Sequence, residues 1–255
     1  MNITLDKTKL TGLNDIVFKA IMYPKIHLMK SILESVLNRN IDKLRYLGQE
    51  IPVVQFIEKG KRLDAFAETE NEYFDIEVST KFSKYISWRN YAFASQVYTK
   101  TVKRGEHYKD YKHTYLINII GNRKGKIPIR IGKNVDQIND DMTNVITEIQ
   151  INVDYFIKEY YNKGNKKLIN KYKYIIMLGL ALEELKEFNK EYGDDVVEEY
   201  TETMDKILDD EEIEPLFTFR EEKIIEAREE GIEIGEKIGE KRGEKYNVPI
   251  GVDTL

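Results

Sequence analysis

Two carboxylates, Asp64 and Glu77, lie on neighbouring segments that alternate between apolar and polar residues in the manner of β-strands. The polar turn Thr69–Glu72 between the segments predicts a hairpin. If the turn is centred between residues 70 and 71, Asp64 and Glu77 stand directly opposite each other, with Cβ atoms roughly 4.5–5.5 Å apart. Two negative charges this close are unfavourable without a cation between them. The pattern therefore predicts a divalent metal site.

The alternation along the hairpin also predicts two distinct faces. The face of the two carboxylates carries Arg62, Phe66, Asp75, Ser79 and, by extension, Lys81. The opposite face carries Leu63, Ala65, Ala67, Phe74, Ile76 and Val78, which we expect in a core. The alternative to a metal site is a solvated face whose carboxylates pair with Arg62 or Lys81.

The elements around the hairpin are those of an α/β fold with a helical tail. Residues 14–38 have helical periodicity, with Asn14 or Asp15 able to cap the start and Pro24 able to divide the helix. Strands are expected within 44–67 and at 73–80, 115–120 and 146–156. A long helix is expected over 84–104, with Tyr85, Trp88 and Tyr91 on its apolar face, and helices from residue 170 onward.

Composition excludes several kinds of site. The chain of 255 residues has no cysteine, so disulfides, thiolate zinc sites and cysteine nucleophiles are ruled out. Three scattered histidines, His27, His107 and His113, lack metal-ligand spacing. A metal must then be held by carboxylates, which favours Mg²⁺ or Mn²⁺. Without a membrane-spanning stretch or a signal-peptide pattern, we expect a cytoplasmic protein that does not enter membranes.

The net charge of −5 averages two unlike regions. Residues 1–182 contain 30 Lys and Arg against 20 Asp and Glu, whereas residues 183–214 contain 3 against 15. A basic body suits a polyanion such as DNA. The acidic segment can compete with DNA for the basic face.

Apart from Arg89, near the start of the long helix, the candidate phosphate contacts gather near the end of that helix and in the segment after it. They are Arg89, Lys100, Lys103, Arg104, Lys109, Lys112, Arg123, Lys124 and Lys126. Tyr108 and Tyr111 lie beside the first group and can contact sugars or bases. The alternative is ordinary lysine-rich surface, and for Trp88 and Arg89 a bracing role within the fold.

Glycine recurs every four residues in the charged tail, at Gly231, Gly235, Gly239 and Gly243. On a helix these positions form a ridge without side chains, along which a second helix can pack closely. This predicts self-association, with a dimer favoured, through the C-terminal helices. The alternative is a solvated charged tail, since each glycine within a helix costs about 0.8–1 kcal/mol relative to alanine.

Several motifs, in order, resemble the Rpn family of recombination-promoting nucleases, also described as PD-(D/E)XK nuclease family transposases. Asn14-Asp15-Ile16-Val17-Phe18-Lys19 is similar to the family opening nDxxFK. Arg62-Leu63-Asp64-Ala65-Phe66 and Phe74-Asp75-Ile76-Glu77-Val78 resemble its two acidic strands. Further matches are Arg89, Tyr91, Tyr98, Lys103, Gly105 and Tyr108 in the long helix, the strand at 115–120, and the glycine-repeat tail.

The resemblance implies a restriction-endonuclease-like core, a mixed sheet flanked by helices, and Mg²⁺-dependent hydrolysis of DNA phosphodiester bonds. By resemblance, Asp64 and Glu77 hold the metal, with the Val78 carbonyl as an extra ligand. Asp15 supplies an outer carboxylate that orients metal-bound water, unless it caps its helix.

The sequence departs from the family pattern at Ser79, where the superfamily has Lys and this family commonly Gln. A hydroxyl can orient a water molecule but carries no positive charge. One hypothesis is that Lys81 reaches in from two positions further along. A second departure is Thr101, where members often carry Gln.

We therefore expect a nuclease-like core at 1–165, an acidic helical segment at 166–220, a glycine-repeat helical tail at 221–246 and a terminal segment at 247–255. The predicted function is metal-dependent cleavage of DNA in recombination, mobile elements or phage defence. The alternative is a catalytically impaired nuclease fold that acts as a DNA-binding or assembly module.

Overall fold

The computed structural model describes residues 6–50, 62–101, 105, 107, 111–133 and 145–211, with the single residues Pro215, Ile232, Gly235 and Ile238. The chain divides into two compact units, Asp6–Asp209 and Met1–Leu5 with Asp210–Leu255. All elements named below belong to the first unit. The strand expected at 51–57 lies outside the described residues.

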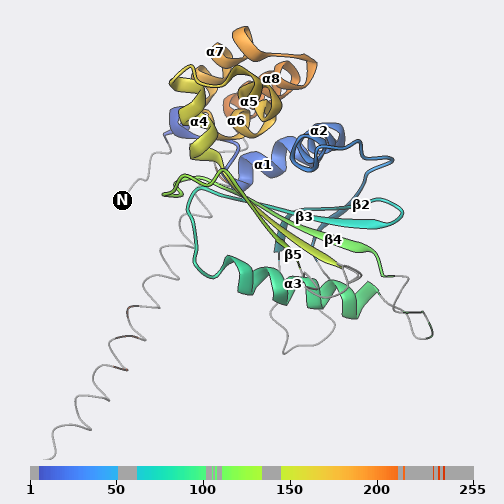
Figure 1. Cartoon of the computed structure of the whole chain (residues 1–255). Coiled ribbons are helices and arrows are strands. Elements are labelled where there is room, and N and C mark those ends of the chain that lie inside the picture. Colours follow the sequence, from blue (N-terminus) through green and yellow to red (C-terminus); the bar gives the residue numbers. More distant parts are fainter. Residues whose placement is uncertain are drawn as a thin grey trace, which may run out of the picture. The chain divides into compact units, whose positions relative to one another are not determined.

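A mixed sheet forms the centre of this unit (Figure 1). Its strands are β1 (Arg45–Glu50), β2 (Arg62–Glu68), β3 (Glu72–Ser79), β4 (His113–Ile120), β5 (Ile129–Lys133) and β6 (Ile146–Asn152), in the order β1-β2-β3-β4-β6-β5. β1, β2 and β3 pair antiparallel, β3-β4-β6 pair parallel, and β5 is antiparallel to β6. The expected α/β class with a mixed sheet flanked by helices is confirmed.

The amphipathic stretch at 14–38 forms two helices. The carboxamide of Asn14 accepts a hydrogen bond from the Ile16 amide and starts α1 (Asp15–Met22). Pro24 separates α1 from α2 (Ile26–Leu37), as its missing amide and fixed φ predict. Both helices bury their apolar residues and cover one face of the sheet (Figure 1).

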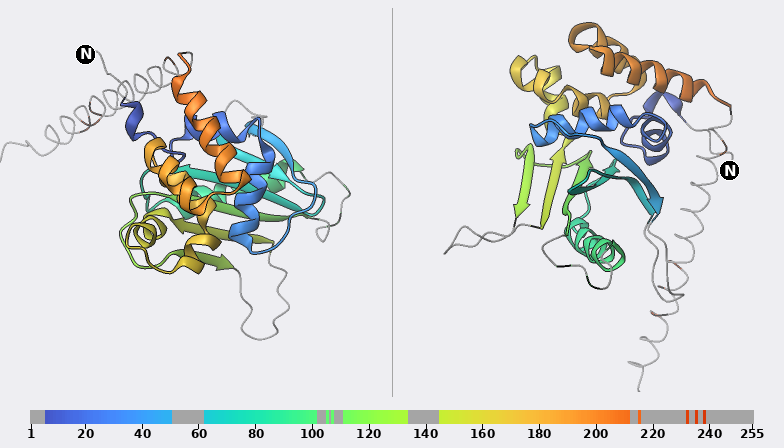
Figure 2. Two further views of the ribbon diagram at one scale, coloured as in Figure 1. Left: turned by 90° about the horizontal axis from the view of Figure 1, so that it is seen from above. Right: turned by 90° about the vertical axis from the view of Figure 1, so that its right-hand side faces the viewer.

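Helix α3 (Ile86–Thr101) joins β3 to the parallel strand β4 and covers the other face (Figures 1 and 2). Its inner face packs Phe93, Ala94 and Val97 against Leu116. The expectation that Tyr85, Trp88 and Tyr91 form the apolar face is wrong, because the residues at 86, 90, 93, 94 and 97 occupy that face. Trp88 is 77% exposed, so it does not brace the fold.

The last strand is shorter than the expected 146–156. β6 ends at Asn152, and α4 (Val153–Tyr161) follows it directly. Val153 and Phe156, three residues apart, are both fully buried and lie on the inner face of this helix.

Four further helices, α5 (Lys166–Lys171), α6 (Lys173–Gly179), α7 (Leu182–Tyr192) and α8 (Asp195–Asp209), pack beyond α1 and α2 (Figures 1 and 2). The acidic α8 buries Val197, Tyr200 and Met204. Glu199, on the same helix, accepts a hydrogen bond from Lys25 (2.7 Å). These acidic helices are therefore packed into the compact unit up to Asp209, which argues against a free segment that competes with DNA.

Candidate active site

The β2–β3 hairpin has the register that its sequence predicts. Ala65 pairs with Ile76 and Phe66 with Asp75, so the alignment continued by one residue places Asp64 opposite Glu77. The face of Asp64, Glu77 and Asp75 is buried beneath α3, with Asp75 only 1% exposed. The alternative of a solvated hairpin face is therefore wrong.

Asp64 lies where the regular pairing of β2 with β3 ends. Its carboxylate oxygen Oδ2 accepts a hydrogen bond from the Val78 amide at 3.0 Å. The carboxylate thus replaces a backbone carbonyl of the neighbouring strand as the acceptor for this amide. The hydrogen bond also fixes the carboxylate at the hairpin edge. The Val78 side chain faces the buried core, as expected.

Lys19 on helix α1 contacts the same carboxylate. Lys19 Nζ lies 2.9 Å from Asp64 Oδ1 and 3.4 Å from Asp15 Oδ2, and its side chain is 15% exposed. Asn14, not Asp15, accepts the capping hydrogen bond, so the alternative role of Asp15 as the cap is wrong. One turn of α1 thus places Asp15 and Lys19 beside Asp64.

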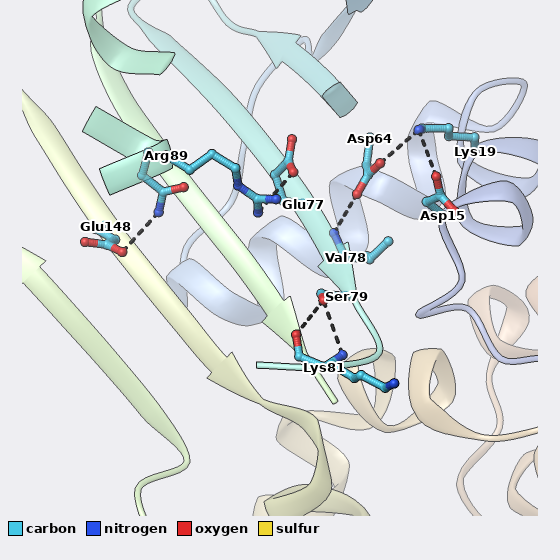
Figure 3. Close-up of polar contacts among 10 residues, drawn as sticks. Asp15, Lys19, Asp64, Glu77, Val78, Ser79, Lys81, Arg89 and Glu148 are labelled. Carbon is cyan, nitrogen blue, oxygen red and sulfur yellow. Dashed lines mark hydrogen bonds and ion pairs between the residues drawn. The ribbon is translucent and has the colours of Figure 1, made fainter. Parts of the chain in front are cut away.

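Arg89 on helix α3 contacts the second carboxylate, that of Glu77. Arg89 Nη2 lies 3.2 Å from Glu77 Oε2, and Glu77 is buried. Figure 3 shows Asp64 and Glu77 next to one another, with Arg89 approaching from one side and Lys19 from the other. The site therefore holds two carboxylates between two cations.

A polar network anchors the start of α3 and so positions Arg89. Glu148 Oε1 on β6 accepts hydrogen bonds from Ser87 Oγ (2.9 Å), Asn90 Nδ2 (3.0 Å) and Gln150 Nε2 (2.7 Å). Because Ser87 and Asn90 flank Arg89 on the helix, the network limits the direction in which its guanidinium can point. Charge-assisted hydrogen bonds of this kind are stronger than neutral ones.

Asn118, on β4, adjoins the carboxylates and was not anticipated. It is the parallel-register partner of Glu77, so the two side chains lie on the same face. It is 2% exposed, and its amide oxygen and nitrogen find no hydrogen-bond partner among the described residues. A buried amide without partners costs about 1–3 kcal/mol. Nothing in the sequence indicates that Asn118 is buried beside Glu77, so sequence reasoning missed this residue.

Ser79 and Lys81 form a local turn at the end of β3. Ser79 Oγ donates to the Lys81 carbonyl at 2.6 Å and accepts from its amide at 3.3 Å. The exposed Lys81 side chain points away from Asp64 and Glu77 in Figure 3. The structure does not bring Lys81 to the carboxylates, because the turn directs it outward; Lys19 is the lysine found there.

The expected phosphate contacts differ in how accessible they are. Lys112 Nζ donates to Glu68 Oε2 and to the Thr69 carbonyl, both at 2.8 Å, and is occupied within the fold. Burial acts to raise the pKa of Glu68, but hydrogen bonds from Lys112 and Arg45 outweigh it and lower that pKa. The predicted role of Lys112 in DNA binding therefore competes with a structural role.

Of the remaining cations, Lys124 and Lys126 are exposed. Arg123 donates to Gln150 Oε1 at 2.9 Å, and burial together with the charge of Arg130 lowers its pKa. Lys103, Arg104 and Lys109, with Tyr108, lie outside the described residues, as does the side chain of Lys100.

The glycine-repeat tail is described at few positions. Gly235 is helical and exposed, with open space around it, and Ile232 and Ile238 are also exposed. Gly231, Gly239 and Gly243 lie outside the described residues, and self-association through this tail stays a prediction.

The side chains available as ligands limit which metal ion the site could hold. No group of three or more His, Asp or Glu side chains in the described part of the chain is arranged to hold one. Two carboxylates suit Mg²⁺, which is commonly bound by one or two carboxylates and keeps several waters.

No helix in the described residues is long and apolar enough to cross a membrane.

A helix, a three-stranded antiparallel meander, a crossover helix and a parallel strand, with acids on the second and third strands, define a restriction-endonuclease-like nuclease fold. Residues 12–230 match the family described as PD-(D/E)XK nuclease family transposase, and the chain belongs to this family. Neither a curated protein nor a solved structure matches the chain. Family membership supports a nuclease-like function.

Proposed function

We propose that the chain is a metal-dependent DNA endonuclease whose active site is built on Asp64 and Glu77. The observation that carries the proposal is the placement of these buried carboxylates side by side, each held by a cation, in a nuclease fold. Such an arrangement is a weak source of stability, because the desolvation of buried ion pairs offsets their attraction.

The proposed metal is Mg²⁺ or Mn²⁺, held by the carboxylates of Asp64 and Glu77 with the Val78 carbonyl. When bound, it would polarise the scissile phosphate and offset the charge that develops in hydrolysis. The attacking water adds to phosphorus and gives up a proton to solvent, the bond to the leaving oxygen breaks, and that oxygen takes up a proton. In this proposal, Asp15, one helical turn from Lys19, orients the attacking water.

Lys19 supplies, in this proposal, the positive charge that Ser79 cannot. Its ammonium lies against Asp64, at the edge where the scissile phosphate would approach. An ammonium in a partly buried site stabilises developing negative charge more strongly than one in water. Asn118 adds an amide that can donate to a water or phosphate oxygen beside Glu77.

DNA is the proposed substrate, and recombination, mobile elements or phage defence the proposed context. Family membership and the basic excess of residues 1–182 support a polyanionic substrate. The exposed Lys124 and Lys126 are candidates for phosphate contacts. Self-association through the glycine-repeat tail is part of the proposal.

A second candidate is a nuclease fold with impaired cleavage that acts as a DNA-binding or assembly module. The observation in its favour is that the Ser79 hydroxyl donates its hydrogen bond to the Lys81 carbonyl rather than to a group in the site. Under this candidate DNA binding persists, but cleavage is slow.

Nicking of supercoiled plasmid with Mg²⁺, Mn²⁺ or EDTA tests both candidates. We expect nicking that EDTA abolishes and that Asp64→Asn or Glu77→Gln removes. Glu72→Gln is the matched control, an ion-paired carboxylate on the same strand as Glu77 but at its other end. Nicking unchanged in Asp64→Asn or Glu77→Gln would rule out the site, and binding without nicking by the native chain would favour the second candidate.

A further inference from the structure

The outer face of α3 carries a cluster of exposed aromatic side chains. Trp88 is 77% exposed, Tyr85 60% and Tyr91 57%, and Phe82 in the preceding turn is 44% exposed. Of the six large aromatic side chains exposed in the described part of the chain, these four lie within ten consecutive residues. Single exposed aromatics are common, but a cluster marks a binding surface.

The geometry of the helix sets these rings in a row. Residues 85, 88 and 91 are three apart, which spaces them about 4.5 Å along the helix axis. The residues that face the sheet are others, among them Ile86, Phe93 and Val97. Figures 1 and 2 show α3 on the face of the sheet opposite α1 and α2, and the exposures of the three rings show that the row is turned away from the core.

The same segment is basic. Residues 79–101 contain Lys81, Lys84, Arg89 and Lys100 and no acidic residue, although 45 of the 255 residues are acidic. Lys84 Nζ lies 5.0 Å from the centre of the Tyr85 ring. Cations interleaved with exposed rings complement a ligand that has both negative charge and flat faces.

The rings of Trp88 and Tyr91 have no aromatic or cationic partner among the described residues. Trp88 is also the immediate neighbour of Arg89, whose guanidinium contacts Glu77. A ligand stacked on Trp88 would therefore contact the same turn of α3 that carries Arg89.

We propose that this outer face of α3, formed by Phe82, Tyr85, Trp88 and Tyr91, binds a nucleic-acid strand with unpaired bases. The bases stack on Trp88 and Tyr91, and Lys84 contacts the phosphates. A duplex keeps its base faces inside its own stack, whereas a single strand presents them. The link to cleavage rests on the proposed function and defines its substrate as a strand with unpaired bases beside the cut.

Trp88 is the single tryptophan of the chain, so its fluorescence reports directly on this face. The experiment uses the full chain with Asp64→Asn, without metal, titrated with a short oligothymidylate, a duplex of equal length, or polyphosphate. We expect the oligothymidylate to quench Trp88 emission at concentrations at which the duplex and polyphosphate leave it unchanged.

Tyr91→Ala in the same background should weaken oligothymidylate binding about fivefold to 150-fold, which corresponds to about 1–3 kcal/mol per stacked base. Tyr161→Ala is the matched control, because Tyr161 of α4 is similarly exposed at 53%. Trp88→Ala, followed by anisotropy of a labelled oligothymidylate, should lose affinity by a similar factor.

Three outcomes would overturn the inference. Equal quenching by polyphosphate would mean that charge alone acts, and equal or stronger quenching by the duplex would mean that paired DNA is the ligand. Emission that changes with protein concentration alone would assign the face to a second copy of the chain. Stacking by a chain that never nicks DNA would instead overturn the proposed function and leave this surface intact.

Discussion

Lys19 Nζ lies 2.9 Å from Asp64 Oδ1, although the two residues belong to different elements, α1 and β2. The contact places a positive charge at the proposed site from a helix rather than from β3, where the superfamily has its lysine. Under the proposed function, this charge takes the place of the one that Ser79 lacks.

Lys19→Met should reduce metal-dependent nicking about 100-fold, the scale expected when one group that stabilises transition-state charge is removed. We expect Mn²⁺ affinity, measured by calorimetry, to stay equal or rise, because Lys19 repels a cation at Asp64. Lys30→Met, which breaks a half-exposed ion pair with Glu34 on α2, is the control. Loss of metal binding together with nicking would assign Lys19 to folding of the site instead.

Ser79→Lys should restore at least a tenth of native nicking to the Lys19→Met variant, because it returns the charge to β3. In the native background the same change should have little effect, since Lys19 already supplies the charge. Initial nicking rates of the four combinations form the double-mutant cycle. A rise of similar size in both backgrounds would show that the two positions act independently.

Asn118→Leu should lower nicking at least tenfold and leave the free energy of unfolding equal or higher. Replacing a buried amide that lacks partners by an apolar group of similar size removes a cost of about 1–3 kcal/mol. Thr114→Val is the control on the same strand, because Thr114 is fully buried and its hydroxyl also lacks a partner in the described residues. Equal nicking by both variants and the native chain would leave Asn118 without a role in cleavage.

Glu68→Gln should lower the free energy of unfolding by about 1–3 kcal/mol at pH 7. The pKa of Glu68 is lowered in the folded state, so its stabilisation is complete above its ordinary value of 4.5 and is lost as the pH falls through the folded value. The difference from the native chain should therefore shrink below about pH 4.5 in urea unfolding. Glu187→Gln, on the exposed face of α7, should change stability by less at either pH.

The sequence predicts local relationships well in this chain. The polar turn at 69–72 sets the β2–β3 register, since a one-residue slip would turn Ala65, Phe74 and Ile76 out of the core. Pro24 and Asn14 likewise divide and start the first helices as their chemistry requires.

What the sequence did not predict depends on contacts between distant segments. Lys19 and Arg89 reach the carboxylates from helices on either side of the sheet, and no spacing in the sequence encodes that approach. The aromatic positions of α3 also fit a helix periodicity, so the inner and outer faces could be told apart only once Phe93 and Val97 were seen against β4 and β6.

The packing of Tyr200 against Gly12 bears on how the protein is made. A Cβ atom at Gly12 would lie 2.1 Å from the Tyr200 hydroxyl, so the fully buried α8 side chain fits only against glycine there. Gly12 precedes the helix that carries Asp15 and Lys19, while Tyr200 is synthesised long after both acidic strands. Helix α1 packs against α8, so it gains this support only after α8 has been synthesised.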